Sequence, residues 1–213
     1  MSVLSDRDIQ KARDKGDLVI SDFKEELLAP ASYDLRVGNK ALKGISERDK
    51  LIIDLSEDHI LEIGTGEFAE VITLERIELS NKLSGRIGIR SYFIRKGLIP
   101  FAGPQIDPGW KGNLIISLFN TGPRSIVLRY GEPFCTIEFS RLESEAEKGY
   151  MGEYQNQSDF PTENIEFMLG AKGVTLYEVV QTMRTLTRDV SWMKWLLALI
   201  FAVLLAQWIA TFI

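Results

Sequence analysis

The sequence predicts a mainly β domain followed by a helix that is long and apolar enough to cross a membrane. Between Leu18 and Leu142, short apolar or alternating runs are separated by Gly, Pro, Asn and Asp, which is typical of an all-β barrel or sandwich. From Leu176 the apolar residues recur at spacings of three and four. The 213-residue chain then runs into an uncharged apolar stretch.

The predicted elements follow in order along the chain. Residues 5–16 (SDRDIQKARDKG) predict a short helix, capped by Ser5 or Asp6 and ended by Gly16. Seven segments then have the composition of strands: residues 50–55, 59–63, 67–74, 82–89, 112–120, 125–130 and 133–139. No internal repeat is evident, so we expect one β domain, the head, over residues 1–142.

Residues 143–173 are polar and contain glycine, and we interpret them as an arm or lid followed by a linker. Residues 174–194 predict a juxtamembrane helix whose apolar residues have heptad spacing, and the same phase continues to Gln207. The seam predicts association between copies of the helix, and the alternative is an amphipathic helix lying on the head or on the bilayer. The seam residues are Leu176, Val179, Met183, Leu186, Val190 and Met193.

Residues 195–213 (WLLALIFAVLLAQWIATFI) predict one transmembrane helix, because at about 1.5 Å per residue they match the thickness of a bilayer core. The alternative, a buried core helix, would normally carry a polar stripe. Arg184, Arg188 and Lys194 precede the segment, so the positive-inside rule predicts a single-pass, C-terminally anchored protein with its head in the cytoplasm. The polar residues 1–15 do not form a signal peptide, and a single cysteine, Cys135, agrees with a reducing compartment.

Composition argues against several classes of function. A zinc-dependent deaminase needs a His or Cys together with a Cys pair, but the chain has only His59 and Cys135. His59 lies in the charged run SEDHI, which favours a solvated turn over a nucleophile pair. The net charge is −5 and no basic cluster is present, so nucleic acid is not an expected partner.

The remaining candidates for a functional site are Asp, Arg and Ser residues in three segments whose composition predicts turns. ASYDLRVGN carries Asp34 and Arg36, IRSYFIRKGL carries Arg90, Ser91 and Arg95, and IDPGWKG carries Asp107. Arginines near a serine suit phosphate oxygens. A carboxylate in a rigid turn suits magnesium, a sugar hydroxyl or a water nucleophile. Singly, each residue is more often structural or solvated.

Together and in this order, the segments resemble the dCTP deaminase family of the trimeric dUTPase superfamily. The resemblance covers residues 3–157 and includes LSDRDI, LAPASYDLRVGNK, RSYFIRKGL, IDPGWKGNLIISLFN, LRYGEPFCTIEF and EYQNQ. It implies a dUTPase-like distorted β-barrel of the β-clip type. It also implies a homotrimer with active sites between subunits, and a pyrimidine deoxynucleoside triphosphate bound with Mg²⁺.

The resemblance also implies roles for individual residues. Asp34, Arg90, Ser91 and Arg95 belong to the nucleotide-binding set, with residues 90–95 as the phosphate loop. Asp107 is the candidate general base near the sugar and attacking water. Ile115, Ile116 and Ser117 form the strand that reads the base, and Tyr150 and Gln157 belong to an arm that folds over the triphosphate. No residue is assigned as a protein ligand of a metal.

Four positions depart from the family pattern. Ser117 stands where the deaminases have a glutamate that shuttles protons, and a serine hydroxyl cannot do this near neutral pH. Tyr92 replaces a small serine, Phe101 replaces a histidine, and Glu153 replaces a lysine of the arm. We therefore expect a membrane-anchored nucleotide-binding protein with degenerate deaminase chemistry. The alternatives are an active dUTPase-type or dCTP deaminase enzyme, and a structural membrane trimer without nucleotide.

Overall fold

The computed structural model describes residues 2–43, 52–56, 60–101, 103, 105–170 and 176–210. His59, residues 171–175 of the predicted linker and juxtamembrane helix, and residues 211–213 of the predicted transmembrane segment lie outside these ranges. The chain divides into two compact units, Met1–Lys172 and Gly173–Ile213.

The first unit is mainly β, as predicted. Its first helix begins as the sequence indicates, because the Ser5 side chain accepts a hydrogen bond from the Asp8 backbone N–H. All seven predicted strand segments contain a strand. The elements of this unit are β1 (Ser2–Val3), α1 (Asp6–Asp14), β2 (Leu18–Ile20), η1 (Glu25–Leu27), β3 (Leu28–Ala29), β4 (Ser32–Lys43), β5 (Ile52–Asp54), β6 (Ile60–Ile63), β7 (Phe68–Leu79), β8 (Leu83–Ile89), α2 (Ser91–Ile94), β9 (Leu98–Pro100), β10 (Gln105–Ile106), β11 (Lys111–Asn120), β12 (Ile126–Arg129), β13 (Pro133–Arg141) and α3 (Thr162–Gly170).

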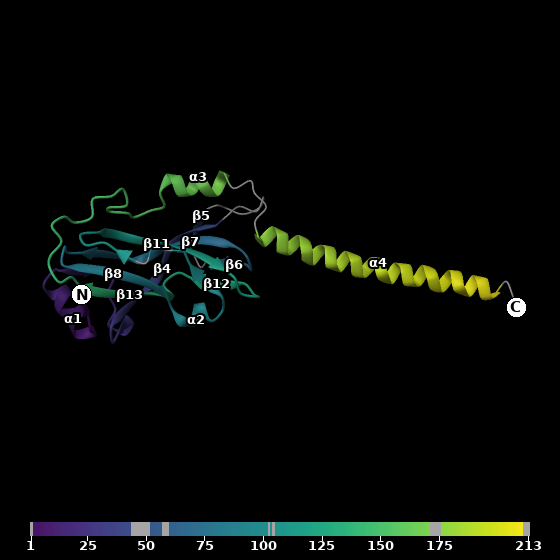
Figure 1. The fold of residues 1–213 in the computed structure, drawn as a ribbon, viewed down its shortest axis with the longest axis horizontal. Coiled ribbons are helices and arrows are strands. Elements are labelled where there is room, and N and C mark those ends of the chain that lie inside the picture. Colours follow the sequence, from purple (N-terminus) through teal and green to yellow (C-terminus); the bar gives the residue numbers. More distant parts are fainter. Residues whose placement is uncertain are drawn as a thin grey trace. The chain divides into compact units, whose positions relative to one another are not determined.

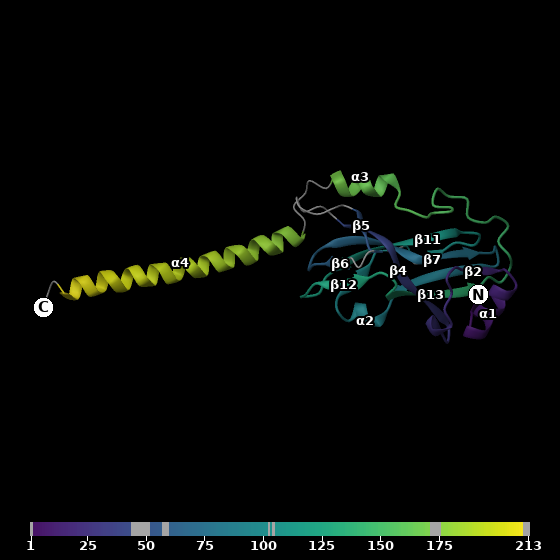
Figure 2. The same cartoon turned by 180° about the vertical axis from the view of Figure 1, so that it is seen from behind.

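The strands form a curled, mainly antiparallel sheet in the order β10-β8-β13-β4-β7-β11-β9, and β6 and β12 form a separate pair (Figure 1). β11 lies antiparallel to β7, and in this register Ser117 is opposite Glu70. The helix α3 lies over β11 and β7, as both ribbon views show (Figure 2). Phe160 and Met168 pack there against Leu42 and Ile72.

β4 corrects one interpretation of the sequence. The segment that carries Asp34 and Arg36 is not a turn but a central strand that pairs with β13 and β7. Its polar residues are tolerated because the buried Arg36 forms an ion pair with the buried Glu75. At Gly38 a Cβ atom would lie 2.7 Å from the carbonyl oxygen of Ile72, so only glycine allows β4 and β7 to approach so closely.

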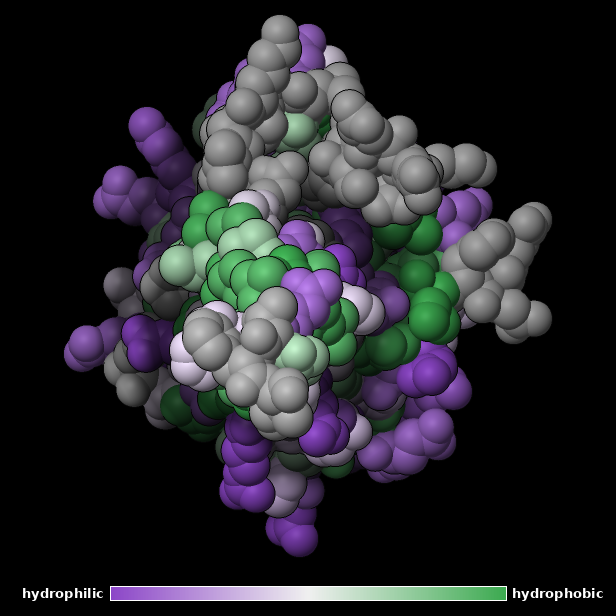
Figure 3. Space-filling model, turned by 90° about the vertical axis from the view of Figure 1, so that its right-hand side faces the viewer, coloured by the Kyte–Doolittle hydropathy of each residue, from purple (hydrophilic) through white to green (hydrophobic). Residues whose placement is uncertain are grey.

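The second unit consists of α4 (Leu176–Ala210), a single continuous helix. The helix over Val179–Ala210 is long and apolar enough to cross a membrane, because its most apolar 18-residue window has a mean hydropathy of 1.9, and none of that window is buried. In Figure 3, which shows the right-hand side of the view in Figure 1, green apolar side chains of the helix face the viewer.

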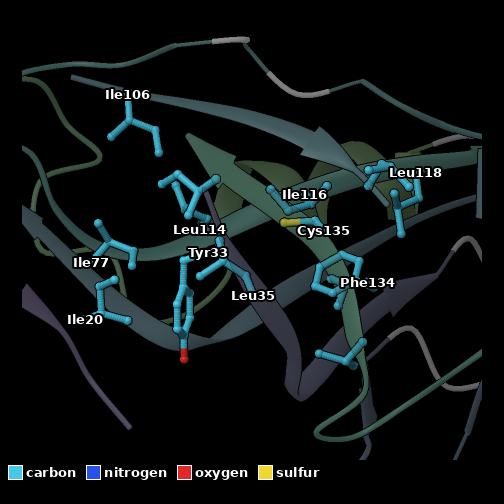
Figure 4. Close-up of a cluster of buried hydrophobic side chains, with 14 of the residues drawn as sticks. Ile20, Tyr33, Leu35, Ile77, Ile106, Leu114, Ile116, Leu118, Phe134 and Cys135 are labelled. Carbon is cyan, nitrogen blue, oxygen red and sulfur yellow. The ribbon is translucent and has the colours of Figure 1, made fainter. Parts of the chain in front are cut away.

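The main core fills the inside of the curled sheet. Side chains from β4, β11 and β13 converge there, and Leu35, Ile116 and Cys135 are all completely buried (Figure 4). Burial raises the pKa of the Cys135 thiol far above its ordinary value. The outward-facing residues of the strands that form this core, among them Ile115 and Ser117, are available to build a site.

Candidate functional site

A cavity of about 470 Å³ lies beside the outward face of β11. Residues from the strands, from the turn before β11 and from the arm line it together. Five of the predicted site residues are among them: Asp107, Ile115, Ser117, Tyr150 and Gln157. Further lining residues are Glu70, Ile87, Phe101, Gly103, Gln105, Ile106, Trp110, Leu114, Tyr154, Pro161 and Asn164.

The turn before β11 presents Asp107 at the cavity. Asp107 is exposed, and its carboxylate accepts a hydrogen bond of 2.8 Å from the Gln105 side-chain amide. The turn depends on Gly109, which has φ +79°. The Trp110 indole N–H donates to the carbonyl oxygen of Tyr154 at 3.1 Å, and this bond ties the turn to the arm.

The arm is bonded to the turn and to the start of β11. The backbone N–H of Tyr150 donates to the Pro108 carbonyl, and Asn113 N–H donates to the Gln157 carbonyl, each at 2.8 Å or less. The Gln155 side chain donates to the Gly109 carbonyl and accepts from Lys111 N–H. Residues of the arm therefore line the cavity of their own chain. The position of the arm on the turn could not be predicted from the sequence.

Two glycines allow the arm to sit this close to the turn. A Cβ atom at Gly109 would lie 2.6 Å from the Cα atom of Gly149, which belongs to the arm. A Cβ atom at Gly149 would lie 2.6 Å from the side-chain oxygen of Asn81. Both distances are well inside van der Waals contact, so any side chain at either position must move the arm or the turn.

Three residues of the strand β11 line the cavity: Leu114, Ile115 and Ser117. The side chain of Ile116 points into the core and is fully buried. The Ser117 hydroxyl donates a 3.0 Å hydrogen bond to Glu70 Oε1 on β7. The Asn164 side-chain amide, from α3, donates to Glu70 Oε2 at 2.8 Å. Glu70 is only 7% exposed.

The predicted phosphate-binding residues lie elsewhere. Ser91 and Arg95 are exposed at the two ends of α2, and none of Asp34, Arg90, Ser91 and Arg95 lines the cavity. Arg90 forms a 3.0 Å ion pair with Asp34 of β4. Burial raises the pKa of the Asp34 carboxyl, and the Arg90 guanidinium opposes this rise.

The cavity of one chain is therefore acidic. Its described lining includes the carboxylates of Glu70 and Asp107 but no Lys or Arg. Among the described residues no group of three His, Cys, Asp or Glu side chains could hold a metal ion. Mg²⁺ is commonly bound through one or two carboxylates together with substrate phosphates, so the carboxylates present fit a magnesium ion that a nucleotide would bring.

Two of the four departures from the family pattern line the cavity, and the other two lie outside its lining. Ser117 and Phe101 line it, and the Phe101 ring lies 6.5 Å from that of Phe68 and 6.1 Å from that of Phe119. Tyr92 is exposed on α2, where Lys96 lies over its ring at 3.8 Å. Glu153 does not line this cavity, but its carboxylate raises the pKa of Tyr154, which does line it.

Glu70 and Asn164 line the cavity but are not among the site residues predicted from the sequence. A signal for Glu70 existed, because it interrupts the apolar run of EFAEVITL at a position that becomes buried. Nothing in the sequence alone indicated Asn164, because its place depends on how α3 packs on the sheet.

Comparisons with known proteins agree with this architecture. Residues 3–142 match the dCTP deaminase-like family. The dCTP deaminase of Pyrococcus furiosus is 42% identical over 144 residues, which cover 67% of this chain and 87% of that protein. The dUMP-forming dCTP deaminase of Methanopyrus kandleri is 34% identical over 170 residues, covering 70% and 87%.

A solved structure supports the fold. The crystal structure of 2'-deoxycytidine 5'-triphosphate deaminase from Agrobacterium tumefaciens superposes with a TM-score of 0.55 at 24% identity. The match covers 66% of this chain and 47% of that one. The expected dUTPase/dCTP deaminase fold is thus confirmed. By its sequence over residues 3–142, this chain belongs to the dCTP deaminase-like family of nucleotide-metabolism proteins.

Proposed function

We propose that the protein is a membrane-anchored member of its family that binds a pyrimidine deoxynucleoside triphosphate with Mg²⁺ and has degenerate deaminase chemistry. One observation carries the proposal: a single cavity unites Asp107, Ser117, Tyr150 and Gln157, which the resemblance assigned to the nucleotide site. At Ser117 the family's proton-shuttling glutamate is absent, and a hydroxyl cannot hold or release a proton near neutral pH.

A homotrimer would complete the site. The cavity's described lining has no cation, while Arg90 and Arg95 lie at α2. A triphosphate needs such cations, because charge-assisted bonds from arginine are the usual means of holding phosphate oxygens. In the proposed assembly, α2 of a second copy supplies them. The helix α4 anchors this assembly in the membrane with the head on the cytoplasmic side.

The test uses the full chain in detergent with Mg²⁺ and each deoxynucleoside triphosphate. Isothermal titration measures binding, and product analysis follows uracil, pyrophosphate and ammonia. We expect binding of a pyrimidine nucleotide without ammonia release. Absence of binding would overturn the proposal and leave a structural membrane trimer as the explanation.

A second candidate is a pyrophosphohydrolase of the dUTPase type. Asp107 favours it, because this exposed carboxylate at the cavity is oriented by Gln105 and can accept a proton from water. In this case Asp107→Asn abolishes pyrophosphate release with little loss of nucleotide affinity. Equal hydrolysis by the variant and the wild type would exclude Asp107 as the general base.

A further inference from the structure

Glu70 is a buried carboxylate that has no cationic partner among the described residues. It is 7% exposed, and none of the ion pairs in this part of the chain includes it. The hydrogen bonds that its two oxygens accept from described residues come from neutral groups, the Ser117 hydroxyl and the Asn164 amide. Burying a carboxylate is costly unless donors surround it. An ionised carboxylate has about four acceptor positions, so about two remain open at the cavity wall.

The groups around Glu70 make this part of the cavity rich in acceptors. The Ser117 hydroxyl donates its one hydrogen bond to Glu70, so its oxygen can only accept a hydrogen bond from a ligand. The Asn164 amide donates one hydrogen to Glu70, which leaves its carbonyl oxygen as an acceptor and its second N–H as a donor. Acceptors outnumber donors here, so a ligand edge that meets these groups binds best when it brings N–H donors. A carbonyl oxygen at the same place would face a carboxylate and be repelled.

We propose that Glu70 is a specificity-determining residue, which selects a base bearing an exocyclic amino group over a base bearing a carbonyl at the same position. This inference rests on the proposed nucleotide function and deepens it. Among pyrimidines, cytosine offers an amino group where uracil offers a carbonyl oxygen, and carboxylates recognise that amino group in other contexts. Glu70 achieves this from β7, across the strand pair from Ser117.

The experiment measures the affinities of the full chain in detergent for the α,β-imido analogues of dCTP and dUTP with Mg²⁺, which resist hydrolysis. We expect the dCTP analogue to bind at least about tenfold more tightly. In Glu70→Gln the amide can donate to a carbonyl, so we expect the ratio to fall to within about threefold. Glu78→Gln is the matched control, since Glu78 lies on the same strand, pairs with Lys111 and does not line this cavity.

A third ligand tests recognition of the amino group without a variant protein. The 2-pyrimidinone analogue of dCTP lacks both the amino group and the carbonyl at this position, so we expect the wild type to bind it more weakly than the dCTP analogue but more tightly than the dUTP analogue. This comparison decides the question if Glu70→Gln does not fold, which circular dichroism would reveal.

The outcomes separate the two proposals. Binding of both nucleotides with equal affinity, or an unchanged ratio in a folded Glu70→Gln, overturns the role of Glu70 and leaves the nucleotide function standing. Absence of binding by the wild type overturns the nucleotide function and the inference together.

Discussion

Glu75 and Arg36 form an ion pair inside the sheet. Glu75 Oε1 lies 2.6 Å from Arg36 Nε, and Oε2 accepts the Arg36 backbone N–H at 2.8 Å. We predict that Glu75→Ala lowers the free energy of unfolding by about 3–5 kcal/mol, because it leaves a buried guanidinium unpaired. Glu78→Ala breaks a more exposed pair with Lys111 and should cost about 1 kcal/mol or less. Chemical unfolding measures both, and equal losses would contradict the prediction.

The purified protein should release no appreciable ammonia from dCTP. Ser117→Glu alone should not restore deamination, because residue 117 lies opposite Glu70 and the change would bring two carboxylates together. Tyr92, Phe101 and Glu153 also differ from the family pattern. An ammonia assay of both proteins checks this, and turnover of the wild type at rates of about 1 s⁻¹ or more would show that the chemistry is intact.

Arg90→Ala should weaken triphosphate binding by about 1.5–3 kcal/mol, the usual effect of losing a hydrogen bond to a charged group. Isothermal titration of the wild type and the variant with the pyrimidine nucleotide that the wild type binds measures the loss of affinity. Arg129→Ala, at an exposed position on β12, is the control and should bind like the wild type. If Arg90→Ala binds the nucleotide as tightly as the wild type, α2 is not part of the proposed phosphate site.

If α4 associates through its heptad seam, cysteines placed along it should crosslink selectively. We predict that cysteines at Leu186 and Leu204 link subunits into trimers in a Cys135-free background, and that one at Arg188 does not. The three positions lie on the same helix, and only the first two share the phase of the seam. Equal crosslinking at all three, or a monomer in mild detergent, would count against the arrangement.

The Cys135 thiol should not react with iodoacetamide at pH 8 while the protein is folded. It is completely buried, and burial raises its pKa, so the reactive thiolate is scarce. Mass spectrometry should find alkylation only after denaturant is added. Rapid labelling of the folded protein would mean that the core around β13 opens locally.

Much of the head could be predicted from the sequence, because alternating apolar residues and turn signals act locally. The strand β4 could not, because Arg36 makes it look polar and its partner Glu75 is 39 residues away. The helix α3 was also missed. It packs through Met168 beside Phe160, against Leu42 and Ile72 of the sheet, and these contacts join residues far apart in the chain.

The candidate site was predicted in part for the same reason. Asp107 and Ser117 belong to a continuous motif, so their proximity follows from the sequence around them. Glu70 reaches the same cavity only through the register of β7 with β11, which sequence spacing does not reveal. The positions of Arg90 and Arg95 outside the cavity likewise depend on the fold of the whole domain.

The contact between Gly109 and Gly149 has a consequence for comparing relatives of this protein. The arm fits against the turn because neither glycine has a side chain, and Gly149 itself does not line the cavity. A single coding change at Gly149 could thus unseat the arm while every lining residue stayed the same. A relative that keeps Asp107, Ser117 and Gln157 but has a larger residue at this position would have the same lining residues in a different arrangement.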